Sequence, residues 1–541
     1  MYRFRGRNIV IFLFIAVYLV GTIVYYHSLT RQVTKVRNEF EESEVDFQVN
    51  DEKPSTEELL TSTVSDVSRF TGIYVREAYR VADNEIRLVY LAKNDNWTPV
   101  IAQINNTWQE IEWFCTNYTT CIDYHHCSIS PRIGRIYIDP KIEHEKLLRI
   151  STTESPEHFE ILLSDKRRKK GERYEHSLGV CLQPVFYLTD WTIIIQFFES
   201  WIAQGATKFY FYLSSYSQQS SHVLKFYKEV LGDDLELVDW SDLPVHFRDR
   251  GNYERDPNAH VFRHAATAFM HDCMMRARNV VKFVSNSDLD DFPFSKNMSL
   301  LTDLETISRR HPKAGQFALD WWLSEQKQDW DSITKPADIS FNLDKVRILD
   351  VDNVRFDYFN AKKFIHRPER VIHLDQHNTY GNEKIRNGYY YTAVELYSNP
   401  NTFFLHLRRF ERFLKNGTIP RYNETTNFET LQSLNNVMIS NYRTRIAGTW
   451  FEKLNQSPWS IEARQVMRNL EQCRNEAFGV ELNDENEMCR ESSAGCAGML
   501  MTDTEFIKSP MTWVNIAHSA KFNNYAGVDE QNSKFRRILK F

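Results

Sequence analysis

The chain has 541 residues, enough for several compact domains. Hydrophobic residues make up 42% of it, charged residues 26% and aromatic residues 14%, which is within the range of globular proteins. The formal net charge of −6 argues against a nucleic-acid-binding protein, which would normally carry a strongly basic face.

The N-terminal part contains an uncharged apolar segment at residues 9–26. A helix of that length spans about 27 Å, close to the hydrocarbon thickness of a bilayer. A cleaved signal peptide is the alternative, but its apolar region would be only about 7–15 residues long and would end in small residues. This segment runs into Tyr25, Tyr26 and His27 instead. We therefore expect a single-pass type II membrane protein with a cytosolic tail (1–8), a transmembrane anchor (9–26) and a lumenal body.

Eight cysteines form one cluster at residues 115–127, a second at 473–496, and two single positions, Cys181 and Cys273. Neither cluster has the CxxC spacing of a zinc site, so disulfides formed in an oxidising compartment are expected. Each cluster has three cysteines, so at least one of each is free or pairs further away, with Cys181 and Cys273 as candidate partners. Seven Asn-X-Ser/Thr sequons are present, and since about five would arise by chance they do not establish a lumenal location.

The chain changes character twice after the anchor. Residues 27–69 are polar and acidic and could bury little, which indicates a stem. Residues 70–172 contain short alternating segments, such as Ile86–Tyr90 and Arg135–Ile138, and are predicted to form a small β-rich domain with the first cysteine cluster.

Residues 173–455 alternate strand and helix patterns, which predicts an α/β fold with a doubly wound, mostly parallel sheet. Residues 456–541 form a cysteine-containing extension for which the sequence suggests no function. In chain order the predicted elements of the α/β domain are strand Val180–Leu188, helix Trp191–Gln204, strand Lys208–Leu213, helix Ser221–Val230, strand Leu235–Trp240, helix Ala259–Arg278 and strand Val280–Val284.

An acidic cluster of Asp288, Asp290 and Asp291 follows the last of these strands. Open α/β sheets bind ligands outside the carboxyl ends of their strands. Alternate carboxylates there can converge on one hard divalent cation, and a bound diphosphate supplies further oxygens. The metal would neutralise charge on a departing diphosphate. An isolated Asp-X-Asp motif is common in charged loops, so its position after a sheet strand is what favours a metal site.

Several fragments in this region, in this order and spacing, resemble glycosyltransferase family 92, which includes nematode and vertebrate β-galactosyltransferases. The resemblance covers about residues 178–410. The fragments are Cys181–Pro184, Phe198–Trp201, Gly205–Tyr212, Val238–Trp240, His271–Cys273, Lys282–Val284 and Asp288–Phe292.

The resemblance implies a GT-A fold, a UDP-sugar donor, Mn²⁺ (or Mg²⁺) and inversion at the anomeric carbon. It also implies a Golgi location and a glycan of a glycoprotein or glycolipid as acceptor. Carried over to this chain, Asp288 and Asp290 become the metal and diphosphate motif. Asp291 stands where the family more often has Glu, which leaves its role open.

Four further residues are candidates for the site. GT-A enzymes commonly add a metal-binding His, and His377 and His406 match family segments, although a single His is as often a hydrogen-bonding residue. An inverting transfer needs a carboxylate base, for which Asp320 beside Trp321 and Trp322 is the first candidate. Arg263, predicted to lie on the helix before the metal strand, could contact the diphosphate, with a surface salt bridge as the alternative.

Two other classes of protein remain open. A lumenal carbohydrate-binding protein could have kept the fold and lost turnover, because fold does not guarantee activity. A metallohydrolase would need more His and Asp ligands near the motif, where only His264 and His271 precede it. The sequence therefore favours a metal-dependent inverting glycosyltransferase, with galactose as the first candidate sugar.

Overall fold

The computed structural model assigns residues 68–541 to one compact unit, separate from residues 1–67. The predicted tail, anchor and stem lie outside the described residues. None of the described helices is long and apolar enough to cross a membrane. The described residues are 72–115, 127–142, 145–168, 171, 173–246, 249–250, 252, 255–326, 328, 333, 335–349, 362–374, 379–385, 388–396, 401–408, 422–424, 428–447, 465–466, 469–470, 489 and 505–517.

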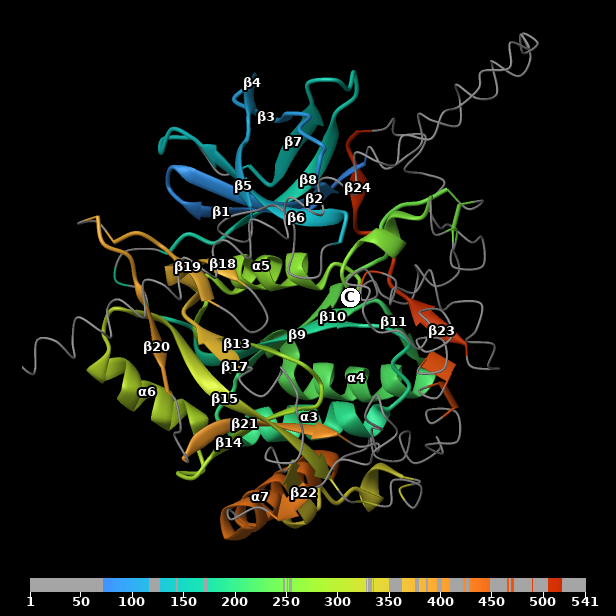
Figure 1. The fold of residues 1–541 in the computed structure, drawn as a ribbon, viewed down its shortest axis with the longest axis vertical. Coiled ribbons are helices and arrows are strands. Elements are labelled where there is room, and N and C mark those ends of the chain that lie inside the picture. Colours follow the sequence, from blue (N-terminus) through green and yellow to red (C-terminus); the bar gives the residue numbers. More distant parts are fainter. Residues whose placement is uncertain are drawn as a thin grey trace, which may run out of the picture. The chain divides into compact units, whose positions relative to one another are not determined.

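A nine-stranded sheet forms the first part of the described chain (Figure 1). Its strands follow the order β4-β3-β7-β8-β1-β2-β6-β5, and β24 pairs with β1. The predicted strands Ile86–Tyr90 and Arg135–Ile138 correspond to β2 and β6. The bounds are β1 Ile73–Ala82, β2 Glu85–Lys93, β3 Val100–Ile104, β4 Thr107–Glu110, β5 Glu112–Cys115, β6 Ile129–Tyr137, β7 Leu147–Thr152, β8 Phe159–Asp165 and β24 Val514–Asn515.

Strands and helices then alternate as predicted. The four strands β12, β10, β9 and β13 pair in that order and are parallel. Helices α3 and α4 share a hydrophobic core with one face of these strands, and α5 shares a core with the other. The bounds are β9 His176–Val185, α3 Trp191–Ala203, β10 Lys208–Leu213, β11 Ser215–Ser217, α4 Gln218–Leu231, β12 Leu235–Asp239, α5 Ala266–Ala277 and β13 Val281–Ser287.

Helix α3 shows why the local sequence determines these elements. The Asp190 side chain caps its first turn by accepting hydrogen bonds from the backbone N–H groups of Thr192 and Ile193. The helix buries Ile194, Ile195, Phe198 and Trp201, which have helical spacing. Gly205 follows it with a φ of +96°, a conformation that glycine adopts at little cost.

Helix α5 begins at Ala266, seven residues later than predicted. The reason is a turn in which Arg263, His264 and Ala265 have φ values of +37°, +55° and +61°. Non-glycine residues rarely adopt this left-handed conformation, and it cannot continue an α-helix. Arg263 therefore lies in a turn and not, as predicted, on the helix.

The four parallel strands belong to an eleven-stranded sheet whose remaining strands include antiparallel pairs. This sheet is therefore mixed, and the prediction of a mostly parallel sheet is wrong. Strand β17 is antiparallel to both β13 and β15, whereas β20 and β21 run parallel to β15. The bounds are β14 Asp291–Ser295, α6 Leu300–Arg310, β15 Ala314–Gln326, β16 Val346–Leu349, β17 Lys362–His366, β18 Val371–Leu374, β19 Thr379–Asn382, β20 Thr392–Glu395, β21 Thr402–Arg408, β22 Tyr422–Glu424 and α7 Phe428–Ile446.

The C-terminal extension contributes strands to both parts of the compact unit. Strand β23 (Phe506–Lys508) pairs with β11, and β24 pairs with β1 of the nine-stranded sheet. Between them, Trp513 is buried and packs edge-on against Trp240, with ring centroids 5.1 Å apart. Residues 505–517 therefore join the first sheet to the α/β part, a role that their sequence did not reveal.

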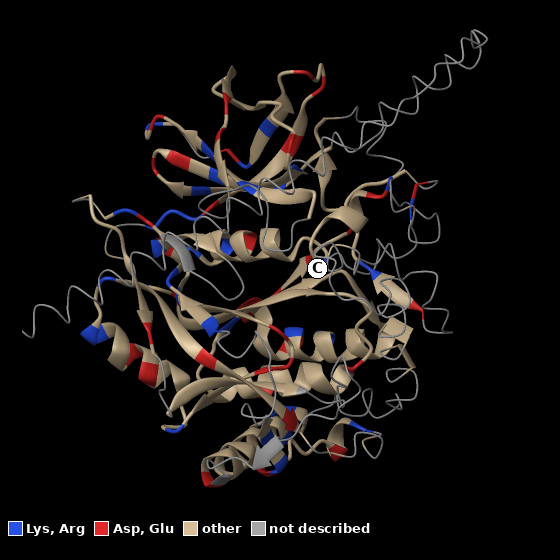
Figure 2. Ribbon diagram, in the orientation of Figure 1, with Lys and Arg blue, Asp and Glu red and all other residues tan. Residues whose placement is uncertain are grey.

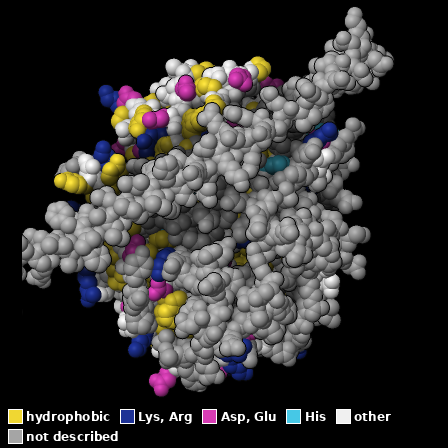
Figure 3. Space-filling model, viewed as in Figure 1, with side chains coloured by type: hydrophobic (Ala, Val, Ile, Leu, Met, Phe, Trp, Pro, Cys, Tyr) yellow, Lys and Arg dark blue, Asp and Glu magenta, His cyan; other side chains and the backbone are white. Residues whose placement is uncertain are grey.

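Charged side chains of both signs are interspersed over the described ribbon (Figure 2). Hydrophobic side chains reach the surface over the nine-stranded sheet, at the top of Figure 3. On that sheet and its loops Trp97 and Trp108 are 63% and 39% exposed.

Two disulfides link distant parts of the chain. Cys181 on β9 pairs with Cys273 on α5, and Cys127 pairs with Cys489 across 362 residues. The two singly placed cysteines thus pair with each other, and the two clusters are joined directly. All described cysteines, including Cys115, are disulfide-bonded.

We expect the double substitution Cys127→Ala/Cys489→Ala to lower the free energy of unfolding by about 5 kcal/mol, because the bond closes a very long loop. Urea unfolding of the oxidised proteins measures this. Cys181→Ala/Cys273→Ala, which opens a shorter loop, should cost somewhat less by loop entropy alone. An unchanged unfolding midpoint for the first pair would contradict this expectation.

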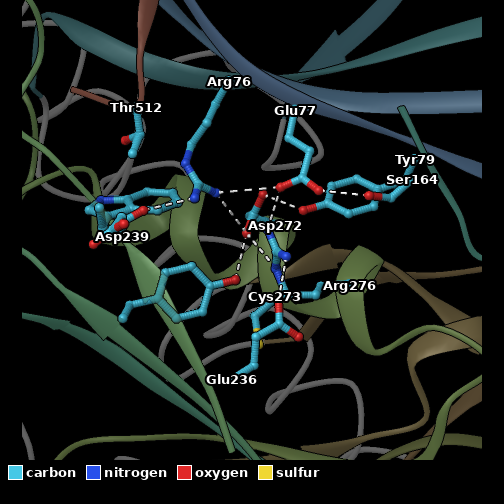
Figure 4. Close-up of polar contacts among 12 residues, drawn as sticks. Arg76, Glu77, Tyr79, Ser164, Glu236, Asp239, Asp272, Cys273, Arg276 and Thr512 are labelled. Carbon is cyan, nitrogen blue, oxygen red and sulfur yellow. Dashed lines mark hydrogen bonds and ion pairs between the residues drawn. The ribbon is translucent and has the colours of Figure 1, made fainter. Parts of the chain in front are cut away.

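A buried ionic network fastens the nine-stranded sheet to α5. Glu77 and Tyr79 of β1 point toward Asp272 and Arg276 of α5 (Figure 4). The Asp272 carboxylate accepts hydrogen bonds from Tyr79 Oη at 2.8 Å and Tyr212 Oη at 2.5 Å. Arg276 forms an ion pair with Glu77, and its Nε atom lies 3.5 Å from Asp272 Oδ2. The first sheet and the α/β part therefore share polar as well as apolar buried contacts.

Candidate active site

The acidic cluster lies where the order of the parallel strands reverses. In chain order β9, β10 and β12 extend the sheet in one direction, and the chain then returns so that β13 pairs with the other side of β9. Such a switch point, outside the carboxyl ends of the strands, is where open α/β sheets bind ligands. Asp288 directly follows β13, and Asp291 begins β14 after a two-residue turn.

Three other strands bring distant side chains to this point. In the antiparallel pairing of β14 with β21, Asp291 lies directly opposite His406. Strand β17 supplies Lys363, and β15 supplies Trp321. The His406 and Trp321 rings are in contact, with centroids 4.3 Å apart.

Asp288, Asp290, Asp291 and His406 each offer a ligand atom, and these atoms all lie within 4.8 Å of one another. The side chains of Asp288 and Asp290 are 14% and 19% exposed, whereas those of Asp291 and His406 are buried. The His406 Nδ1 atom lies 3.1 Å from Asp291 Oδ1 and 3.5 Å from Asp290 Oδ1. In this cluster the carboxylates of Asp288 and Asp290 are therefore partly exposed, whereas the Asp291 carboxylate and the His406 imidazole form a buried pair.

The Asp291 carboxylate is hydrogen-bonded through both of its oxygens. Its Oδ1 accepts hydrogen bonds from Trp321 Nε1 at 2.7 Å and from His406 Nδ1, and its Oδ2 accepts from the Asp288 backbone N–H at 2.8 Å. Burial by itself raises the pKa of the Asp291 carboxyl. The Lys363 ammonium and the hydrogen bond from His406 outweigh that effect and hold this pKa well below its ordinary value.

Lys363 is a buried cation within the cluster. Its Nζ lies 2.7 Å from Asp291 Oδ2 and 3.0 Å from Asp288 Oδ2. Burial by itself lowers the pKa of Lys363, but these two carboxylates reverse the effect and raise it. Three carboxylates and one ammonium give a net charge of −2 with His406 neutral, which a single divalent cation would neutralise.

The residues present fit a hard divalent cation. Carboxylate oxygens suit Mg²⁺ and Mn²⁺, and an imidazole nitrogen is an accepted additional ligand for transition metals. His406 Nε2 is buried, and among the described residues nothing forms a hydrogen bond with it. An unpaired buried nitrogen is costly, and a bound metal is one way to satisfy it.

The other predicted site residues are not members of this cluster in the described structure. His377 lies outside the described residues. Asp320 lies inside the long strand β15, and its carboxylate pairs with Lys362. Since successive strand residues point to opposite faces, Asp320 points away from the face that carries Trp321. Arg263 stacks over the Phe262 ring, with its guanidinium 5.4 Å from the ring centroid.

Sequence reasoning missed the part that Lys363 and Trp321 play in the cluster. Lys363 is one of two adjacent lysines in an apolar strand, and nothing in that pattern distinguishes the buried one. Trp321 was named only as a neighbour of Asp320, but its indole N–H donates to Asp291. Both depend on strand pairings that connect residues 30 or more positions apart.

A second group of side chains lies beyond the carboxyl ends of β9 and β12. Phe186, one residue after β9, stacks on His264 with ring centroids 4.3 Å apart. His264 Nδ1 lies 3.1 Å from Asp242 Oδ1, and its backbone carbonyl accepts a hydrogen bond from Trp240 Nε1. These contacts hold the left-handed turn before α5 at the same edge of the sheet as the acidic cluster.

Comparison with known proteins gives a match to a protein family. The profile of glycosyltransferase family 92 matches residues 176–450, which is half of the chain. No curated protein sequence matches the chain. Among solved structures, the crystal structure of amylomaltase from Corynebacterium glutamicum has 11% sequence identity to this chain and a TM-score of 0.13. That likeness covers 29% of this chain and 23% of the amylomaltase chain.

The matched range includes the four parallel strands, the acidic turn after β13, and the strands that carry Lys363 and His406. The ordered fragments noted in the sequence lie within it as well. This chain is therefore a glycosyltransferase and belongs to glycosyltransferase family 92.

Proposed function

We propose that this protein is a metal-dependent, inverting glycosyltransferase with a GT-A type fold. It would transfer a sugar, with galactose as the first candidate, from a UDP-sugar to a glycan of a glycoprotein or glycolipid in the Golgi lumen. The observation that carries the proposal is the convergence of Asp288, Asp290 and His406 at the switch point of the parallel strands.

Asp288, Asp290 and His406 would hold Mn²⁺ or Mg²⁺. When bound, the metal would stabilise the negative charge that develops on the leaving diphosphate. The protein contributes a preformed set of ligands, because Lys363 restrains Asp288 and the backbone N–H of Leu407 donates to the Asp290 carbonyl at 2.7 Å. Ligands that are already oriented need less rearrangement when the metal binds.

The donor nucleotide would lie along the carboxyl edge of β9 and β12, beside Phe186 and the turn at Arg263. Two observations support this placement. The first turn of α5 begins three residues after Arg263, and helix N-termini favour phosphate groups. The three left-handed residues before it are a costly conformation of the kind that clusters at functional sites.

The general base would be a carboxylate, and Asp320, whose carboxylate pairs with Lys362, is the candidate from the sequence. If it is the base, Asp320→Asn should lower kcat by about 100-fold or more with little change in KM for the donor. An unchanged kcat would remove Asp320 from the reaction.

The test is UDP release by the full-length protein from UDP-galactose, UDP-glucose, UDP-N-acetylglucosamine and UDP-N-acetylgalactosamine. Each donor is assayed with Mn²⁺ and with EDTA. We expect one donor to be consumed with Mn²⁺ and none with EDTA. Equal turnover in EDTA would overturn metal dependence. If glycan binding is measurable but no donor is bound or consumed, the carbohydrate-binding alternative takes its place.

A further inference from the structure

We propose that Asp291 is not a ligand of the metal but the positioning residue that prepares the site. It orients His406 and, through Lys363, restrains Asp288. The inference rests on the proposed metal site and assigns separate roles to the adjacent acidic residues Asp290 and Asp291.

The first argument is the acceptor capacity of the Asp291 carboxylate. An ionised carboxylate has about four acceptor positions, two on each oxygen. Oδ1 accepts from Trp321 Nε1 and His406 Nδ1, and Oδ2 accepts from the Asp288 backbone N–H and Lys363 Nζ. All four are occupied, and the side chain is buried. A metal could reach Asp291 only by breaking one of these bonds.

The second argument concerns the tautomer of His406. A carboxylate can only accept, so His406 Nδ1 must carry the proton in its hydrogen bond to Asp291. The lone pair of a neutral imidazole then lies on Nε2, which is buried and lacks a partner among the described residues. A carboxylate behind a metal-binding histidine typically fixes the tautomer and the ring orientation in this way. Because Asp291 and His406 are cross-strand neighbours, the strand pairing supports the same contact.

The third argument is the link from Asp291 to Asp288. Asp291 Oδ2 accepts from the Asp288 backbone N–H, which fixes the turn, and it also binds Lys363 Nζ. Lys363 Nζ in turn binds Asp288 Oδ2. One buried carboxylate therefore constrains two of the three expected metal ligands. Asp290, which is more exposed, is left to face the metal and the diphosphate.

The test is a double-substitution cycle on Mn²⁺ affinity with the full-length protein. The variants are Asp291→Asn, His406→Phe and the combination. An asparagine provides one acceptor oxygen in place of two, so either His406 or Lys363 loses its acceptor. We expect Asp291→Asn to weaken Mn²⁺ binding by about 10–100-fold, as for other residues behind a metal ligand. In the His406→Phe background the same change should cost much less. If Asp291 were itself a ligand, Asp291→Asn would still weaken Mn²⁺ binding strongly in the His406→Phe background, because the metal would lose a ligand there too.

Pulsed electron paramagnetic resonance of the bound Mn²⁺ gives a second readout. The wild-type spectrum should contain a ¹⁴N coupling from imidazole, which His406→Phe removes and Asp291→Asn removes or weakens. A full ¹⁴N coupling in Asp291→Asn, together with an undiminished loss of affinity when the change is made in the His406→Phe background, would overturn the inference. If the wild-type protein binds no Mn²⁺, the proposed metal site itself fails, and the two failures are thus distinguishable.

Asp303→Asn is the matched control. The Asp303 carboxylate binds Ser295 and Thr402, which face each other at the other end of the same β14–β21 pair. We expect its Mn²⁺ affinity to stay within about twofold of wild type, because Asp303 is not a member of the candidate metal cluster. Thermal melting of every variant separates lost binding from lost folding. A Mn²⁺ affinity loss in Asp303→Asn equal to that in Asp291→Asn would show that any disturbance of these strands suffices.

Discussion

Asp290→Asn is expected to lower kcat/KM for sugar transfer by about 1,000-fold or more, which corresponds to about 4 kcal/mol of transition-state stabilisation. Asparagine keeps the shape of the side chain but removes the negative charge. The charge matters because the cluster would bind a divalent cation. Its net charge is −2 in the wild type and only −1 in the variant. The measurement is the rate of UDP release at saturating Mn²⁺.

The fold should survive this change. The Asp290 backbone carbonyl accepts from the Leu407 N–H, and a side-chain substitution does not remove that bond. Asp233→Asn, on the exposed turn after α4, is the control and should leave kcat/KM unchanged. If Asp290→Asn retains more than about a tenth of wild-type kcat/KM at saturating Mn²⁺, Asp290 does not hold the metal in the transition state.

Asp272→Asn is expected to lower the free energy of unfolding by about 3–5 kcal/mol, because it removes a buried negative charge that compensates two buried arginines. The Asp272 carboxylate lies 3.3 Å from Arg76 Nη1 and 3.5 Å from Arg276 Nε, beside the two tyrosines described above. Urea unfolding at pH 7 measures the loss. The control Asp165→Asn removes an acid from a half-exposed pair with Arg167 and should cost no more than about 1 kcal/mol. A loss for Asp272→Asn no larger than the control would contradict the structural role of the network.

The same network makes stability depend on pH. Burial by itself raises the pKa of Asp272, but Arg276 and Arg76 outweigh it and hold the pKa below its ordinary value. A depressed pKa in the folded state contributes stability above the unfolded-state pKa of about 3.9, and that stability is lost as the pH falls toward the folded-state pKa. Wild type should therefore lose stability below about pH 4, and Asp272→Asn should lose less over the same range.

The sequence predicted the local elements well where their patterns are self-contained. Strand Lys208–Leu213 has the predicted bounds, and helix Trp191–Gln204 is one residue longer than α3. Helix α5 was placed too early because a left-handed turn of Arg, His and Ala has no sequence signature comparable to glycine. The mixed strand directions after β13 could not be read either, since pairing direction depends on long connections and not on alternation within a strand.

The sequence predicted the site residues that lie close together in the chain. It predicted fewer of the site residues that strand pairing brings in from distant segments. Asp288 and Asp290 were found because they follow a sheet strand within one motif. His406 was one of two candidates, and β21 places it opposite Asp291. The role of Lys363 and the Cys127–Cys489 disulfide depend on contacts across 75 and 362 residues, which no local pattern encodes. The sequence placed Asp291 in the acidic cluster but did not predict its role, because its four hydrogen-bond partners come from four different segments.

The most direct test of the metal and diphosphate site is UDP binding to the full-length protein, measured calorimetrically with Mn²⁺ and with EDTA, for wild type and Asp290→Asn. If the cluster holds a metal that bridges to the diphosphate, wild type should bind UDP at least about tenfold more tightly with Mn²⁺, a coupling of about 1.4 kcal/mol or more. That difference should disappear in Asp290→Asn. UDP affinity that is equal in Mn²⁺ and EDTA, or a coupling that persists in Asp290→Asn, would contradict the assignment of this cluster as the metal and diphosphate site.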